Sequence, residues 1–226
     1  YDFILKLLIA HGGSGINARR VAALLWPDAG ETAAQNSFDN ALHRLRKLLG
    51  DERCILLHNG SLAIDPTLLW TDLQAMQACV ARSDALLRSD GPREGRHDAD
   101  DELASIARRL LALYEGPFLD GEGGFAIYAV VRERLRGQYL RVLSSIAARD
   151  EALGEPQRAR EVYRRILEQD PLAEAVSRSM IRCCLSLGLR AEAFDVYRRC
   201  RDNLSIMLGV KPSAETERLL EHLRVD

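Results

Sequence analysis

Four polar side chains recur along residues 32–50 at a spacing that suits recognition of DNA bases. Asn36, Asn40, His43 and Lys47 follow one another at intervals of four, three and four residues. Because an α-helix turns once in about 3.6 residues, they would share one helical face. Asparagine amides can bind the N6 and N7 atoms of adenine in the major groove, and lysine can neutralise a phosphate. The alternative is that these residues only form the solvent-exposed side of an ordinary amphipathic surface helix.

The other side of the same stretch is apolar. Its apolar residues recur at intervals of three and four, which predicts a helix with one buried face. They are Phe38, Ala41, Leu42, Leu45, Leu48 and Leu49. Gly50 should end this helix. Arg44, Arg46 and Lys47 gather near its end and could hold phosphates, whereas Asp39 on its flank should repel them.

The neighbouring segments predict what positions this helix. Residues 2–11 carry a helical apolar pattern, and a second helix follows Asn17, whose side chain can cap it, and stops before Trp26-Pro27. After Arg53, the runs 54–58 and 61–65 alternate around Asn59-Gly60, a strong hairpin signal. The order of three helices and a β-hairpin predicts a winged helix-turn-helix domain over residues 1–70.

Residues 71–226 are predicted to be helical throughout, apart from turns. The segments ALGEPQRAREVYRRIL (152–167) and SLGLRAEAFDVYRRCR (186–201) align at an offset of 34 residues, the period of tetratricopeptide repeats. Tyr163 and Tyr197 take equivalent positions and should be buried between helices. The polar segment 89–101, which ends in an acidic run, is interpreted as a solvated loop. The fold class is therefore mainly α, a winged helix followed by a tetratricopeptide-like repeat domain.

Composition and motifs exclude several classes of protein. The formal charge is −2, from 31 Lys and Arg against 33 Asp and Glu, and no apolar run is long enough to span a bilayer. The five cysteines form no C-x-x-C pair, which favours reduced thiols and a cytoplasmic location. The five histidines are scattered, and no glycine-rich loop leads into a Lys-Ser/Thr pair. We therefore expect no enzyme, no cofactor and no metal site.

Six motifs in this order resemble one family. They are VAALLWPD (21–28), LHRLRKLLG (42–50), LYEGPFLDGE (113–122), RERLRGQYL (132–140), DPLAEA (170–175) and LGVKPSAET (208–216). The chain resembles the SARP-type bacterial transcriptional regulators, in which an OmpR-like winged helix precedes a bacterial transcriptional activator domain. The resemblance implies domains at 1–70 and 71–226, sequence-specific binding of double-stranded DNA, and activation of transcription.

The resemblance also implies partners and contacts. The wing tip, formed by His58, Asn59 and Ser61, would touch the minor groove or phosphates, and the loop 27–31 would lie where OmpR-like activators touch RNA polymerase. A homodimer or an upstream domain of the same chain is a further expected partner.

Two departures from the family pattern matter. The small sheet that normally precedes the first helix is absent or lies upstream, since the chain starts directly in a helix. That would leave an exposed apolar edge made of Phe3, Ile4, Ile55 and Ile64. We expect this edge to pack on the helical domain, on another copy of the chain or on an upstream segment. A tryptophan usual after the EGPFL-like turn is also missing, and Phe125 and Tyr128 are the nearest aromatics.

Charge argues against DNA binding. Residues 1–72 carry seven basic side chains, Lys6, Arg19, Arg20, Arg44, Arg46, Lys47 and Arg53, against eight acidic ones. The proposed contact set is Asn36, Asn40, His43, Arg44, Arg46, Lys47, Arg53, His58, Asn59 and Ser61. The competing interpretation is a protein-interaction module of a larger signalling protein or ATPase, whose winged helix no longer binds DNA.

Overall fold

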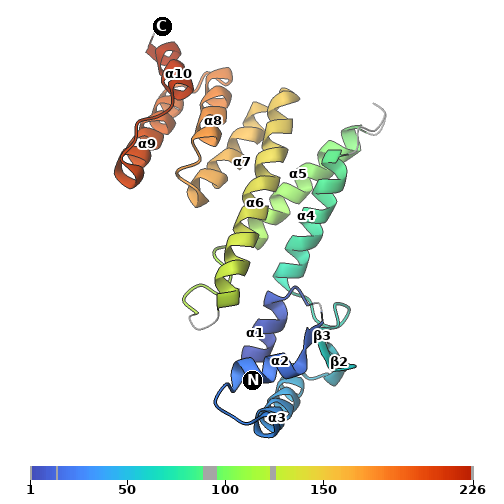
Figure 1. The fold of residues 1–226 in the computed structure, drawn as a ribbon. Helices are drawn as coiled ribbons and strands as arrows, with labels where there is room; N and C mark the ends of the chain where they lie inside the picture. The colour runs from blue at the N-terminus through green and yellow to red at the C-terminus, as the bar shows by residue number, and fades with distance from the viewer. Residues whose placement is uncertain (1, 14, 89–95, 123–125, 225–226) are drawn as a thin grey trace. The chain divides into compact units, whose positions relative to one another are not determined.

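The computed structural model describes residues 2–13, 15–88, 96–122 and 126–224. These residues are mainly helical, with one small β-sheet, and they form two compact units (Figure 1). The first unit comprises residues 1–78 and 116–133, and the second comprises residues 79–115 and 134–226. The helices α4 (Asp72–Arg88) and α6 (Ala126–Ala152) each contribute residues to both units.

The first unit contains the predicted helices and hairpin in the predicted order. Its elements are α1 (Asp2–Ala10), β1 (Ile16–Asn17), α2 (Ala18–Leu25), α3 (Glu31–Leu49), the 3-10 helix η1 (Glu52–Cys54), β2 (Ile55–His58) and β3 (Ser61–Ile64). Asn17 caps α2 as expected, because its side chain accepts a hydrogen bond of 3.1 Å from the backbone N–H of Arg20. Trp26 ends that helix ahead of Pro27.

The sheet has one strand more than the sequence predicted. β2 and β3 form the expected hairpin, and Asn59 and Gly60 form its turn with φ angles of 50° and 73°. The additional strand β1 pairs antiparallel with β3, so the strand order is β1-β3-β2. With only two residues, β1 offers no alternation that a sequence pattern could reveal.

The core of this unit lies between the helices and the sheet. It includes the following residues: Leu7, Leu8, Phe38, Leu42, Leu45, Ile55 and Leu62. In the apolar edge expected to need a cover, Ile4, Ile55 and Ile64 are buried, and Phe3 is 44% exposed. Leu48 differs from the prediction, since it is 68% exposed. It lies at the margin of the apolar stripe of α3, where the helix reaches its last turn.

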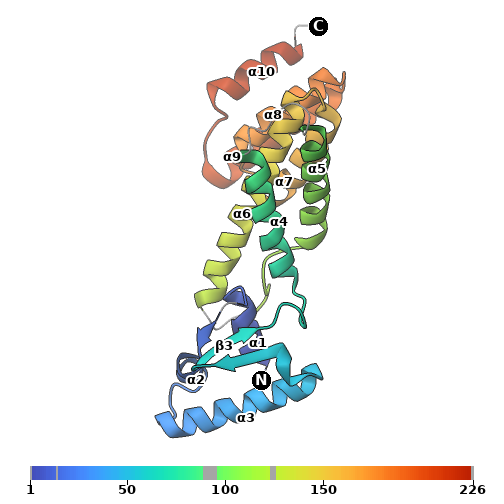
Figure 2. The same ribbon diagram turned by 90° about the vertical axis from the view of Figure 1, so that its right-hand side faces the viewer.

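The second unit contains the repeats. Its further helices are α5 (Arg96–Leu113), α7 (Pro156–Gln169), α8 (Glu174–Ser186), α9 (Arg190–Leu208) and α10 (Ala214–Arg224). α8 packs against both α7 and α9 and lies between them in Figure 1, and Figure 2 shows the same helices from a direction turned by 90°. Tyr163 on α7 and Tyr197 on α9 are 2% and 4% exposed, which confirms their predicted burial.

The start of α5 corrects one interpretation. The sequence predicts a solvated loop for residues 96–101, but they form the first turns of α5. Acidic side chains near a helix N-terminus are favoured by the helix dipole, which explains why this run can begin a helix. Within the unit, Glu102 binds Arg82 at 2.6 and 2.7 Å. Residues 89–95, the rest of the predicted loop, lie outside the described residues.

The segment with the missing tryptophan is held by other contacts. Arg132 donates to the backbone carbonyls of Phe118 and Glu122 at 2.6 and 2.9 Å and also to that of Leu119. Tyr128 is buried and meets the ring of Phe118 edge to face, with centroids 6.2 Å apart. Phe125 lies outside the described residues.

Candidate nucleic-acid interface

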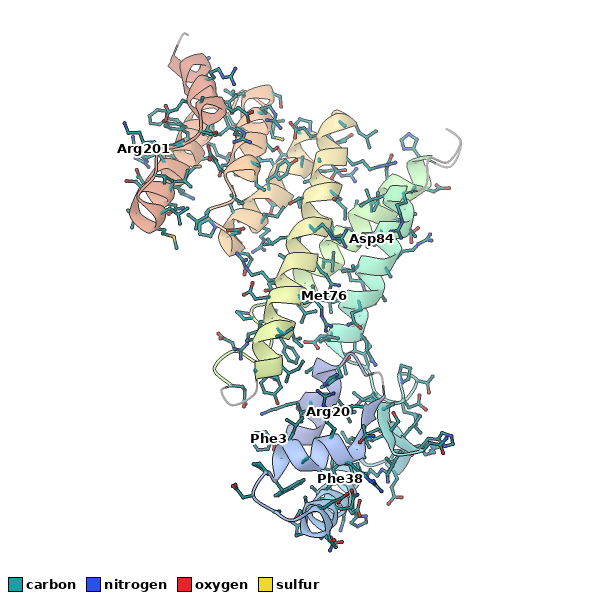
Figure 3. All side chains as sticks on the ribbon, viewed as in Figure 1. Phe3, Arg20, Phe38, Met76, Asp84 and Arg201 are labelled. Carbon is teal, nitrogen blue, oxygen red and sulfur yellow. The ribbon has the colours of Figure 1, made fainter. Side chains whose placement is uncertain are left out.

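Helix α3 presents the polar face that the sequence predicted. Its inner side buries Ala34, Phe38, Leu42 and Leu45, which fixes the rotation of the helix against the core (Figure 3 labels Phe38). The polar side chains on its other side are all exposed, namely Asn36, Asn40, His43, Arg44 and Lys47. The helix ends at Gly50, whose φ of 80° lies in the left-handed region. A rigid helix thus carries two amides, one imidazole and two cations on its free surface.

Arg46 does not belong to this free surface. Its side chain is half-buried, and Nε and Nη2 donate to the carbonyl oxygen of Ile55 at 3.1 and 2.7 Å. Because β2 pairs with β3 on its other side, this contact fastens α3 to the free edge of the hairpin. The structure therefore gives Arg46 a role in holding the hairpin, in contrast to the predicted phosphate contact.

Arg53 is exposed but already paired. Its Nη2 lies 2.8 Å from Asp51 Oδ2 and its Nε lies 3.1 Å from Asp51 Oδ1. The Arg53 guanidinium holds the pKa of the Asp51 carboxyl below its ordinary value. Since Arg53 is 77% exposed in its side chain, the pair is open to solvent, and the carboxylate offsets much of its positive field. Arg53 is consequently a weaker phosphate ligand than its charge alone predicts.

The three residues predicted at the wing tip differ in their solvent exposure. His58 and Asn59 are exposed, whereas Ser61 is half-buried. The Ser61 hydroxyl lies close to the backbone of Gly15, since a Cβ placed at Gly15 would be only 2.2 Å from Ser61 Oγ. Ser61 thus serves the close approach of β3 to the segment ahead of β1, and His58 and Asn59 remain available to a ligand.

Two arginines outside the predicted contact set lie beside α3. Arg19 and Arg20 are exposed in the first turn of α2, which packs on α3 (Figure 3 labels Arg20). Arg19 also lines a hollow between the two helices together with Gln35. The N-terminal end of a helix favours anions, and two cations there strengthen the effect. The signal is present in the sequence as the pair Arg19-Arg20, two residues after the capping Asn17.

Acidic and apolar groups lie on the same unit as the exposed cations Arg19, Arg20, Arg44 and Lys47. Asp39 is exposed on α3, and its Oδ1 accepts a hydrogen bond of 2.9 Å from Gln35 Nε2. Leu48, Leu56 and Leu57 are exposed apolar residues of the same unit. The surface around α3 is thus mixed, which fits a modest electrostatic attraction to DNA.

Metal ligands, membrane-spanning helices and reactive thiols are other features that could carry a function. Within the described residues, no group of three or more His, Cys, Asp or Glu side chains could hold a metal ion. None of the helices in the described part of the chain combines the length and the apolar content that crossing a membrane requires. The cysteines Cys54, Cys79, Cys183, Cys184 and Cys200 are all buried free thiols.

Comparisons with known proteins place the chain in a family. The bacterial transcriptional activator domain family matches residues 71–224, which is most of the chain. No curated protein sequence matches it. Among solved structures it is similar to Mycobacterium tuberculosis EmbR in complex with a low-affinity phosphopeptide, with a TM-score of 0.61 and 20% identity over 92% of this chain and 54% of the other. This likeness concerns the fold, and the chain spans about half the length of the EmbR chain. The chain belongs to the bacterial transcriptional activator domain family of transcriptional regulators, as the SARP-type resemblance of its motifs predicted.

Proposed function

We propose that this chain is a sequence-specific DNA-binding transcriptional regulator, with a winged helix at residues 1–70 and an activator domain at residues 71–226. The observation that carries the proposal is the exposed polar face of α3, where Asn36, Asn40 and Lys47 stand opposite a buried apolar side. The strand β1 adds support, because it ties the hairpin to the start of α2 and makes helices and wing one compact unit.

The side chains of this face would act in two ways. Asn36 and Asn40 would read bases, because an amide can bind adenine through two hydrogen bonds at once. Arg44 and Lys47 would hold phosphates and set the register of the helix in the groove without reading sequence. His43 lies between the two groups along the helix and could contact either a base or a phosphate.

Phosphate contacts would extend beyond α3. Arg19 and Arg20 at the start of α2 and His58 and Asn59 at the hairpin tip are exposed within the same compact unit. Because the near-neutral charge of residues 1–72 provides no broad positive field, we expect modest affinity that falls steeply with salt.

The activator domain would supply further contacts. We propose that it mediates dimerisation with a second copy of the chain, reception of a signal or contact with RNA polymerase. A loop of the winged helix is a second surface for a partner. This loop, residues 27–30 between α2 and α3, is mostly exposed, so it is accessible to a large partner such as polymerase.

The phosphopeptide that EmbR binds in the structure compared is not proposed as a ligand of this chain, because the shared part covers only half of the EmbR chain.

The experiment separates base reading from phosphate binding. Fluorescence anisotropy of labelled duplexes, taken from a selection on random DNA, is measured at several salt concentrations with the full chain. Asn40→Ala should relax the base preference at one position, at a cost of about 1–3 kcal/mol in discrimination, and leave the salt slope unchanged. Lys47→Ala should weaken all sequences alike and lower the slope of log K against log salt by about one unit.

Lys211→Ala is the matched control. Lys211 is exposed and lies in the second unit, so removing its charge should leave the DNA affinity and the salt slope as they are. Negligible binding of every duplex at low salt, by the unaltered chain and by all variants, would overturn the proposal.

The competing function is a protein-interaction module without DNA binding. The exposed apolar residues Leu48, Leu56 and Leu57 favour it, since apolar groups on one unit suit a protein partner better than a phosphate backbone. Two results together would favour this competing function. The unaltered chain would fail to bind DNA, and a Leu48→Gln variant would lose the binding of a protein partner that the unaltered chain binds.

A further inference from the structure

A pocket of about 300 Å³ lies within the repeat unit, among α7, α8 and α9. Its buried lining consists of Ser177 and Met180 from α8 and Val196 and Cys200 from α9. Leu167 adds a half-buried apolar wall. A pocket of this size lies at the small end of those that hold small molecules, and its lining is mainly apolar, as is usual for them.

The buried interior of the pocket carries no charge. Burial raises the pKa of the Cys200 thiol above its ordinary value, so at neutral pH the group is protonated. The Ser177 hydroxyl lies within hydrogen-bonding reach of that thiol. The part of a ligand that enters the pocket should therefore be apolar.

One cation at the pocket is not offset by a carboxylate. Arg164 binds Glu168 at 2.8 Å and also pairs with Glu161, so its charge is compensated. Arg199 is exposed at the pocket, and among the described residues no hydrogen bond or ion pair involves it. The lining therefore offers one free guanidinium, which binds a carboxylate well because its planar donors match the two oxygens.

The pocket is bounded at one edge by a link between elements. Asn203 on α9 donates through Nδ2 to the carbonyl oxygen of Pro171, in the turn between α7 and α8, at 3.4 Å. Both residues line the pocket. A small molecule fits such a bounded space better than an extended peptide, which would have to continue past this edge.

We propose that this pocket binds a small amphipathic monoanion, with an apolar body among Met180, Val196 and Cys200 and one carboxylate paired with Arg199. The family match assigns no ligand to these residues. The proposal does not depend on DNA binding, because every residue involved lies in the second unit.

The test uses octanoate as the probe and methionine methyl groups as reporters in the full chain. The chain has three methionines, Met76, Met180 and Met207, so a spectrum of protein labelled with carbon-13 at the methionine methyls contains three signals. Octanoate should shift the Met180 signal saturably and leave the other two in place, with Met180→Leu used for assignment. Octanol, which keeps an apolar chain of the same length without the charge, should bind more weakly.

Two arginine variants make the control. Arg199→Gln should weaken octanoate about tenfold or more, because it removes the paired charge. Arg198→Gln removes the same charge one residue away, but Arg198 pairs with Asp195 at 3.0 Å and does not line the pocket, so affinity should be unchanged. Circular dichroism checks that both variants keep their helices.

Several outcomes would overturn the proposal. They are the absence of a saturable Met180 shift, equal binding of octanol and octanoate, and binding that Arg199→Gln leaves intact. An acidic apolar peptide that shifts Met180 when octanoate does not would assign the pocket to a protein partner instead. Each of these results is independent of the DNA titrations.

Discussion

Three arginines near the end of α3 differ in whether a neighbouring group already binds their guanidinium. Arg44 is exposed on the helix, Arg46 is bound to the Ile55 carbonyl, and Arg53 is paired with Asp51. All three have the same charge and the same intrinsic affinity for phosphate. In the structure only Arg44 keeps a guanidinium without a competing partner among the described residues.

Arg46→Ala should therefore destabilise the first unit. Removing this side chain leaves the Ile55 carbonyl at the edge of β2 without its charged donor, which should cost about 1–3 kcal/mol. Urea denaturation followed by tryptophan fluorescence measures it, because both tryptophans, Trp26 and Trp70, lie in the first unit. Arg44→Ala is the control and should leave stability nearly unchanged while lowering DNA affinity. Equal midpoints for the two variants would contradict the role given to Arg46.

Asp39→Asn should tighten binding to any DNA duplex. The carboxylate is exposed on the proposed contact helix, and its removal takes away repulsion from phosphate, most strongly at low salt. Asparagine keeps an oxygen that can accept the hydrogen bond from Gln35, so the helix surface should otherwise be preserved. Anisotropy titrations at two salt concentrations check this, and an unchanged affinity at low salt would place Asp39 away from the phosphates.

At the scale of elements, the helices α7 and α9 share two features, a buried hydrogen-bonded tyrosine and a glycine turn before the helix. Tyr163 on α7 donates to Glu151 at 3.1 Å, and Tyr197 on α9 donates to Glu217 at 3.0 Å. Gly154 and Gly188 take φ angles of 79° and 72° at the turns before these helices. The 34-residue spacing thus places one buried tyrosine in each repeat.

Tyr163→Ala should cost about 3–5 kcal/mol of unfolding free energy, as removal of a large buried aromatic side chain does. Tyr163→Phe removes only the hydroxyl, which is hydrogen-bonded to Glu151 and Ser179, and should cost about 1–2 kcal/mol. Urea denaturation followed by circular dichroism separates the two effects. A cost of Tyr163→Ala no larger than that of Tyr163→Phe would mean that the ring does not fill the space between the helices.

The repeat unit should lose stability in alkali. Burial raises the pKa of Tyr139 and Tyr163 from 10.0 to about 12 and that of Cys183 and Cys184 from 9.0 to about 11. A group whose folded pKa is raised contributes stability below its unfolded pKa and loses it as the pH rises through the folded value. The unfolding free energy should therefore decline as the pH increases from 9 towards 12.

Urea denaturation by circular dichroism across this pH range measures the decline, and Tyr163→Phe should make it shallower because one titrating group is gone. A free energy that stays constant up to pH 12 would contradict the burial of these groups.

At the scale of the whole molecule, the compact units and the family match divide the chain differently. The family match begins at residue 71, where the sequence predicts that the second domain starts. The compact first unit, however, also includes residues 116–133. Lys6 on α1 binds Glu122 at 2.7 Å within this unit. The proposed DNA-binding module therefore depends on a segment that belongs, by sequence, to the activator domain.

A fragment of residues 1–78 should consequently be less stable than the same residues in the full chain. It lacks residues 116–133, including the buried Tyr128 and Val131, and so loses part of the apolar surface that its unit buries. Trp26 and Trp70 are present in both molecules, so one fluorescence probe reports both transitions. Equal urea midpoints would mean that residues 116–133 add no stability to the unit.

The sequence by itself determined the features that depend on residues near one another in the chain. The period of α3, the cap at Asn17, the Asn59-Gly60 turn and the repeated tyrosines were all predicted and are present. Each of them is set within a few turns of helix or one hairpin, where backbone geometry leaves few alternatives. The repeat adds the comparison of two copies, which fixes the register of the tyrosines.

Tertiary structure alone decided the features that join distant segments. The pairing of β1 with β3, the binding of Arg46 to the Ile55 carbonyl and the membership of residues 116–133 in the first unit have no local signal. The pocket beside Arg199 likewise arises only where α7, α8 and α9 meet. A side chain's type gives its charge and size, but its free or bound state depends on what packing brings to it, and packing is a property of the whole fold.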